Sequence, residues 1–246
     1  MMQQRWMLII LVMAATLPHS VQAQVYPRWF LFQGEIPSTR IAVGYVMPAW
    51  HPDSAAQYAF RYGCTTYAMH KHCSVIGGEI FWATEGGTAW MGSDITVEYD
   101  TALAEQIQEE FCILDTYHDA KKTITLGGDS TIGLDKTMKT KIAIGSVPMP
   151  DWVETLPSKP GTIFAVGAAQ EYYYETSSWA RAEHIARLAL ARQIGTQVAG
   201  RQKQNEIEGQ DLRHDIFAAE LREIRVVARW RDVNKKIFYV LVSMQQ

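Results

Sequence analysis

His70, His72 and Cys73 lie within four positions of one another, and these are side-chain types that bind zinc in proteins. A zinc site needs three or four ligands that converge on one point. The segment is predicted to be helical, and on a helix His70 and His72 point about 200° apart, so that only His70 and Cys73 share a face. The pattern favours the polar end of a helix over a metal site, and we predict no metal and no cofactor.

The segment Gly128-Asp129-Ser130 is similar to the nucleophile block of one esterase family. In that family the block follows the first strand near the mature N-terminus, whereas here it lies mid-chain in a predicted hairpin, where these residues are turn formers. The histidines that follow it, His184 and His214, fall in predicted helices. The carboxylates between Glu109 and Asp115 are typical of a solvated helix face. We therefore predict that the chain is not an enzyme.

The sequence contains a long internal repeat, which predicts how the chain is divided. With a shift of 123 positions, residues 27–77 align with residues 150–200 without a gap, and with a shift of 113 the ends of the two copies align. Both copies open with Pro-x-Trp and continue with a strand that ends in Ala-Val-Gly. The repeat predicts two tandem modules, residues 24–147 and residues 148–246.

Each module is predicted to be β-α-α-β-β, an antiparallel sheet with helices packed on one face, which makes the fold class α+β. The second, more polar helix is expected near Asp100–Glu110 in copy one and near Asp211–Glu223 in copy two. Two strands joined by a hairpin close each module. Copy one is ten residues longer, which indicates an added hairpin near residues 80–92. The alternating residues 131–146 predict one more strand.

The first helix of copy two has the clearest periodicity. We predict it over Ser177–Ala199, with a serine cap at its start and an apolar stripe that includes Trp179. Glu183 and Arg187 fall largely off this stripe. The small residues on the stripe predict that the helix lies close to a sheet.

The N-terminus has the pattern of a secretory signal peptide. Arg5 supplies a positive charge, residues 7–17 form an apolar core, and small residues precede a cleavage site between Ala23 and Gln24. The alternative, a transmembrane anchor, needs roughly 20 apolar residues, and this run is shorter. A lipoprotein would carry a cysteine at the cleavage point. We therefore predict an exported protein that is not directly lipidated and has no membrane span after cleavage.

Three cysteines, all in copy one, leave one thiol over if a disulfide forms. Cys64 and Cys73 are predicted to share a helix, about 13 Å apart along its axis, which is too far for a bridge. Cys112 is then one partner in any disulfide. Three buried reduced thiols are the alternative.

Aromatic residues in two equivalent loops and in the added hairpin are the candidates for a contact surface. They either form a recognition surface or cap the edge of a sheet. These residues are Trp50, Phe81, Trp82, Trp90, Tyr172, Tyr173 and Tyr174.

Copy two combines its Pro-x-Trp and Ala-Val-Gly with the helix ARAEHIARLALARQIGTQVAG and the closing segments ARWRD and KIFYVLVSM. In these segments it resembles the Lpp-twenty lipoprotein family over about residues 150–244, and it is similar to the N-terminal module of the flagellar assembly protein T family. The internal repeat extends the likeness to residues 27–127. The resemblance implies a bacterial cell-envelope protein without established catalysis, associated in some relatives with flagellar structures, and it transfers no catalytic residue.

These observations favour a non-catalytic scaffold or interaction protein of the periplasm or the outer-membrane periphery, with other envelope proteins or further copies of itself as partners. A second hypothesis is a small-ligand or peptide-binding module that uses the cleft between the copies. A metallo- or serine hydrolase is a remote third. The net charge of −3, without a stripe of Lys and Arg, argues against nucleic acid as a partner.

Overall fold

The structure, a computed structural model, describes residues 24–48, 51–84, 87–195 and 211–246. Within the strands it leaves out the side chains of residues 79–94 and 211–217. The predicted signal peptide with its cleavage site after Ala23 lies outside the described residues, and so does Trp50. Among the helices that are described, none is long and apolar enough to cross a membrane.

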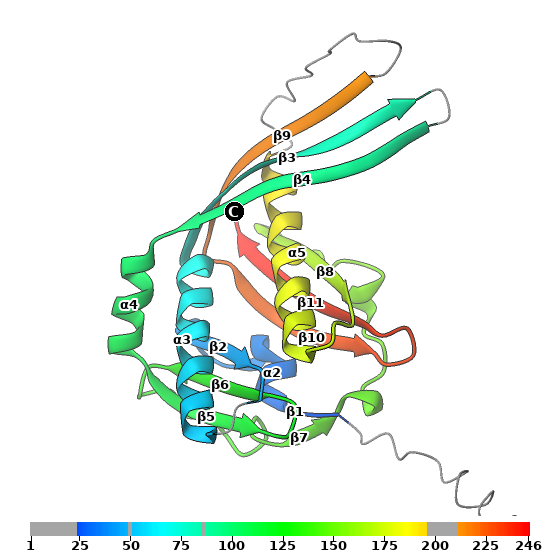
Figure 1. Cartoon of the computed structure of the whole chain (residues 1–246). Coiled ribbons are helices and arrows are strands. Elements are labelled where there is room, and N and C mark those ends of the chain that lie inside the picture. The colour runs from blue at the N-terminus through cyan, green and yellow to red at the C-terminus, as the bar shows by residue number, and fades with distance from the viewer. Residues whose placement is uncertain (1–23, 49–50, 85–86, 196–210) are drawn as a thin grey trace, which may run out of the picture.

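The two copies have the same arrangement of one helix on a three-stranded antiparallel sheet. In copy one the elements of this arrangement are β2 (Ile41–Val46), α3 (Pro52–Lys71), β5 (Cys112–His118) and β6 (Thr123–Gly128). In copy two they are β8 (Thr162–Gln170), α5 (Glu175–Gly195), β10 (Arg225–Asp232) and β11 (Ile237–Gln245). The sheet orders, β2-β6-β5 and β8-β11-β10, are equivalent. Figure 1 shows α3 over the first sheet and α5 over the second. The structure is α+β, as predicted.

A glycine in the first strand of each copy explains how closely the helix approaches. A Cβ atom on Gly44 would lie 1.7 Å from the carbonyl oxygen of Ala59, and one on Gly167 would lie 1.9 Å from that of Ala182. Ala59 and Ala182 are themselves 123 positions apart. The helix backbone therefore rests directly on the strand at the same point in both copies, which only glycine permits.

A third sheet joins the copies. It has the order β4-β3-β9 and consists of β3 (His72–Thr84), β4 (Gly87–Tyr99) and β9 (Asp211–Arg222). The hairpin predicted near residues 80–92 exists but is longer, because it begins directly after α3. The outer part of this three-stranded arm extends away from the body of the molecule (Figure 1).

The predicted helix near Asp211–Glu223 was wrong, because this segment is strand β9. All of β9 pairs with β3, from His72 opposite Arg222 to Ala83 opposite Asp211. Its described end alternates, with Ala219 and Leu221 buried and Glu220 exposed, as in a strand with one covered face. Pairing with the added hairpin of copy one therefore overrides the helical tendency of the segment.

Other predicted elements are present. Helix α4 (Thr101–Glu110) is preceded by the cap residue Asp100, whose side chain accepts hydrogen bonds from the backbone N–H groups of Ala102 and Leu103. The strand expected within residues 131–146 is β7 (Lys141–Ala143), and it pairs with β1 (Val25–Pro27). The remaining short elements are α2 (Arg28–Leu31), η1 (Gln33–Glu35), η2 (Ile144–Ser146) and η3 (Asp151–Val153).

One hydrophobic core includes residues of both copies. Trp179 of α5 is fully buried, and its ring contacts Tyr26 and Phe30 of copy one and Phe238 of copy two at centroid distances of 5.7, 5.5 and 4.7 Å. Its indole N–H donates a hydrogen bond to the Tyr26 hydroxyl over 3.0 Å. The two predicted modules thus share a core, with Trp179 at their junction.

Candidate functional site

A group of charged side chains is buried between the two copies around Glu183 of α5. The Glu183 side chain is 3% exposed, and its Oε2 accepts hydrogen bonds from Arg229 Nη2 over 3.0 Å and from the Tyr45 hydroxyl over 3.3 Å. On the other carboxylate oxygen, His70 Nε2 lies at 3.2 Å and Arg187 Nη2 at 3.8 Å. The carboxylate therefore links α3 and β2 of copy one to α5 and β10 of copy two.

These partners decide the charge on Glu183. Burial alone would raise the pKa of this carboxyl, but the nearby His70 ring and the charges of Arg229 and Arg187 outweigh it and hold the pKa well below its ordinary value. Burial lowers the pKa of His70, although Glu183 opposes this effect. Glu183 is therefore an anion over the ordinary pH range. The nearer of its two guanidinium partners is the buried one of Arg229.

Arg229 also fixes the start of copy one. Its Nη1 donates hydrogen bonds to the Phe30 carbonyl over 3.0 Å and to Gln33 Oε1 over 2.8 Å, and its guanidinium lies over the Phe30 ring. Glu183 and Arg187 fall largely off the apolar stripe of α5, yet both are buried. Copy one packs on the side of α5 that a single amphipathic helix would expose. The sequence signal for this was the tandem repeat itself, since two modules can bury a second face of each helix.

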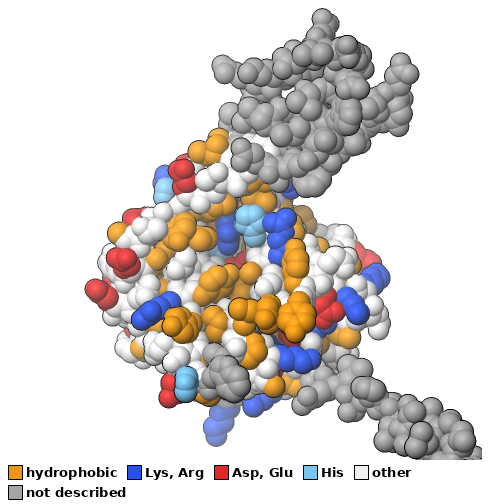
Figure 2. All heavy atoms as spheres, viewed as in Figure 1, with side chains coloured by type: hydrophobic (Ala, Val, Ile, Leu, Met, Phe, Trp, Pro, Cys, Tyr) orange, Lys and Arg blue, Asp and Glu red, His pale blue; other side chains and the backbone are white. Residues whose placement is uncertain are grey.

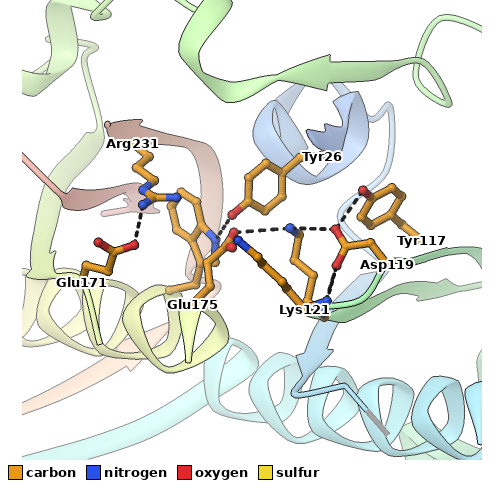
Figure 3. A network of polar contacts seen from close by, with 9 residues as sticks. Tyr26, Tyr117, Asp119, Lys121, Glu171, Glu175 and Arg231 are labelled. Atoms are coloured by element: carbon orange, nitrogen blue, oxygen red, sulfur yellow. Dashed lines mark hydrogen bonds and ion pairs between the residues drawn. The ribbon is translucent and has the colours of Figure 1, made fainter. Parts of the chain in front are cut away.

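A second buried network joins the copies at the start of α5 (Figure 3). The Lys122 side chain is 1% exposed, and its Nζ lies 3.0 Å from Asp119 Oδ2 and 3.4 Å from Glu175 Oε1. The same ammonium lies 4.3 Å from the centre of the Tyr26 ring. Nearby, Arg231 pairs with Glu171 over 2.6 Å. Burial raises the pKa of Glu175 to about 7, and attraction from Arg231 only partly offsets this.

A cleft of about 530 Å³ opens between the copies, within the size range of small-molecule sites. Copy one contributes Ile41 and the last turn of α3, with Tyr67, His70 and Lys71. Copy two contributes the beginning of β8, the beginning of β10 and the end of β11. A void of about 10 Å³ shares His70 and Ile41 with the cleft and also touches Glu183. His70 therefore lies between the cleft and the buried charges.

The residues that were weighed as a zinc site are divided by the secondary structure. Helix α3 ends at Lys71, so the prediction that Cys73 lies on that helix was wrong, and both His72 and Cys73 belong to β3. His70 contacts Glu183, whereas His72 Nε2 lies 2.5 Å from Glu220 Oε2 on the exposed face of the sheet. Within the described residues, no group of three or more His, Cys, Asp or Glu side chains could hold a metal ion.

The esterase-like segment forms a turn after β6. The Asp129 carboxylate accepts hydrogen bonds from the backbone N–H and the hydroxyl of Thr131, at 2.9 and 2.8 Å. These bonds lower the pKa of Asp129. In the carboxylates between Glu109 and Asp115, Glu110 pairs with Arg40 and Asp115 accepts a hydrogen bond from the Trp29 indole. The segment and the carboxylates thus hold turns and element ends in place.

All three cysteines are free in the structure. Cys64 and Cys73 are buried, and burial raises the pKa of the Cys64 thiol to about 12. Cys112, the candidate disulfide partner, is exposed, which corrects the alternative of three buried thiols.

The candidate aromatic surface is described in part. Tyr172, Tyr173 and Tyr174 precede α5 and are all exposed, Tyr173 to 94%. The backbones of Phe81, Trp82 and Trp90 lie in β3 and β4, but their side chains are outside the described set, as is Trp50. Figure 2 shows further apolar side chains gathered over the region of α3 and α5. Of the exposed apolar residues, Tyr58 and Tyr62 belong to α3.

Comparison of the chain with protein-family models, with curated proteins and with solved structures found no match. The resemblance to the Lpp-twenty and flagellar assembly protein T families therefore stays a prediction from the sequence. What the structure adds is a duplicated α+β unit whose two copies meet at a cleft and at two buried charge networks.

Proposed function

We propose that this chain is a non-catalytic protein of the bacterial cell envelope that acts as a scaffold or interaction component. On this proposal it is exported to the periplasm or the outer-membrane periphery without a lipid anchor, and it contacts other envelope proteins or further copies of itself. Export is supported by the signal-like residues 1–23, and a link to flagellar or envelope assembly by the resemblance of copy two.

The projecting arm is the observation that carries the interaction role. Strand β4 has one neighbour among the described residues, β3, so its other edge is open to a further strand. Most of the arm lies away from the shared core (Figure 1). An extended segment of a partner that adds to such an edge gains main-chain hydrogen bonds without any change in the body of the protein.

A photo-crosslinking residue placed on the edge strand tests the interaction role. We propose Thr96 and Glu98, both exposed on β4, with exposed Glu109 on α4 as the matched control position. In native cells, Thr96 and Glu98 are expected to give a discrete adduct with one envelope protein or with a second copy, and Glu109 is not. Equal adduct yields at all three positions, or no adduct from β4, would overturn the proposal.

Export has a separate test. N-terminal sequencing of the protein from fractionated cells is expected to begin at Gln24 and to locate it in the periplasmic or outer-membrane fraction. An uncleaved chain in the cytoplasmic fraction would refute export while leaving the role of the arm open to the crosslinking result.

A further inference from the structure

The cleft between the copies has a charge that differs from that of the whole chain. Its lining carries three cationic side chains, Lys71, Lys159 and Arg225, and one anionic side chain, Glu223. The chain as a whole has a net charge of −3. Because burial lowers the pKa of His70, this ring adds little further charge near neutral pH. The cleft is therefore a positive region in a negative protein.

Two of these cations have no carboxylate partner among the described residues. Lys71 pairs with Glu223, which neutralises both. Arg225 instead donates through Nη2 to the carbonyl oxygens of Gly34 and Ile36, at 3.0 and 2.9 Å, and its buried Nε has no hydrogen-bond partner in the described part of the chain. Lys159 is exposed and forms no ion pair with the described residues. An anion in the cleft would meet these two charges.

The rest of the wall combines apolar side chains with uncharged polar ones such as Gln33, Thr162 and Gln245. Ile41, Val226 and Met244 line the cleft although they are 5%, 1% and 7% exposed, and Phe164 and Tyr67 join them. Apolar walls with a few charged groups are the usual composition of small-molecule sites. The lining therefore suits a ligand with an apolar body as well as a charged head.

The geometry of the cleft wall is held by both copies. Glu223 has a φ of 53°, in the left-handed region that residues other than glycine rarely adopt, so the backbone is strained there. Its N–H donates to the Lys71 carbonyl over 3.2 Å, and the N–H of Ile224 donates to the His70 carbonyl over 2.8 Å. The strained turn between β9 and β10 is thus fixed against the end of α3, where the cleft forms.

We propose that this cleft binds an amphipathic organic anion, with a carboxylate or phosphate head at Lys159 and Arg225 and an apolar chain against Ile41, Phe164 and Val226. The site is independent of the role proposed for the arm. Fatty-acid carboxylates and lipid phosphates share this chemistry.

Isothermal titration calorimetry of the mature chain tests the site with decanoate and decyl phosphate, each below its micelle concentration. Both anions are expected to bind once per chain, and the one that binds more tightly identifies the carboxylate or the phosphate as the natural head. Decanol and decyltrimethylammonium are expected to bind at least about tenfold more weakly. Each methylene removed from decanoate is expected to weaken binding by roughly two- to fourfold.

A charge reversal supplies the matched variants. Lys159→Glu is expected to weaken decanoate binding by roughly tenfold, whereas Lys139→Glu, which reverses an exposed lysine away from the cleft, leaves it unchanged. Both lysines are exposed, so both variants are expected to fold, which circular dichroism checks. The proposal is overturned if neither anion binds, if decanol binds as tightly as decanoate, or if Lys159→Glu binds like Lys139→Glu.

Discussion

Glu175 and Glu183 lie on the same helix, and both are buried, yet their carboxyl pKa values shift in opposite directions. Around Glu183, the His70 ring and the guanidinium groups of Arg229 and Arg187 outweigh the cost of removing a charge from water. Near Glu175, Lys122 lies closer to Asp119, and burial prevails, so that the pKa rises to about 7. The number and the placement of cations therefore decide the charge of each glutamate.

The raised pKa of Glu175 predicts a pH-dependent effect of Glu175→Gln. The folded state binds this proton up to about pH 7 and the unfolded state only up to about 4.5, so the wild type loses stability as the pH rises between these values. The variant lacks this loss. It is expected to be more stable than the wild type at pH 8, by at most about 3 kcal/mol, and about equally stable at pH 4.5. Urea unfolding at both pH values measures the difference.

Glu109→Gln is the control for this experiment, because Glu109 is exposed on α4. Its difference from the wild type is expected to be small and the same at both pH values. If Glu175→Gln gives an equally flat profile, or is less stable than the wild type at pH 8, the ionised Glu175 carboxylate is not destabilising in the folded state.

At the scale of single residues, the sequence indicated which apolar side chains are buried better than which charged ones are. Trp179 was predicted on the apolar stripe of its helix and is fully buried. Glu183 and Arg187 fall largely off that stripe, and helical periodicity marks only one covered face, yet both are buried. Their burial depends on Tyr45, His70 and the start of copy one, which are distant in sequence, and no local pattern contains that information.

Elements with a strong local signal were predicted well. The polar helix after Asp100 has a side-chain cap and ends at Glu110 as expected, and the closing hairpins of both copies are present. The error was β9, whose helix-like spacing of apolar residues is compatible with alternation too. Its partner β3 extends into the segment that only copy one has, so the repeat could not predict the pairing.

The contact between helix and strand predicts that Gly44→Ala and Gly167→Ala are equally damaging. In each, the new Cβ would meet the carbonyl oxygen and a backbone nitrogen of the overlying helix at 2.5 Å or less, and backbone atoms cannot move aside as a flexible side chain can. Each substitution is expected to reduce the free energy of unfolding by about 2 to 4 kcal/mol. Thermal and urea unfolding measure this loss.

Gly133→Ala provides the comparison, because a Cβ there would meet nothing within 4 Å. Its effect is expected to stay within about 0.5 kcal/mol. If either Gly44→Ala or Gly167→Ala were equally mild, the helix of that copy would not rest on its strand as closely as described.

At the scale of the whole molecule, the repeat predicts the architecture of each copy, but it does not say whether the two copies fold independently. The two copies have equivalent sheets, yet Trp179, Glu183 and Arg229 of copy two have partners in copy one. Strand β9 of copy two pairs only with β3 of copy one among the described strands. Two tandem modules in sequence are therefore one packed body, in which neither copy completes its own buried contacts.

This shared core predicts that the intact chain unfolds in one cooperative transition and that residues 148–246 alone do not fold stably. In isolation, Trp179 would lose its contacts with Tyr26 and Phe30, and Glu183 would lose its contact with His70. The stability lost with these contacts exceeds what a domain of marginal stability can tolerate.

Tryptophan fluorescence and far-UV circular dichroism of the intact chain should give superimposable urea curves. Adding residues 24–147 to the isolated half should restore a cooperative transition, because it supplies the missing partners. Two separate transitions in the intact chain, or an isolated half as stable as the whole, would show instead that the copies are independent domains in contact.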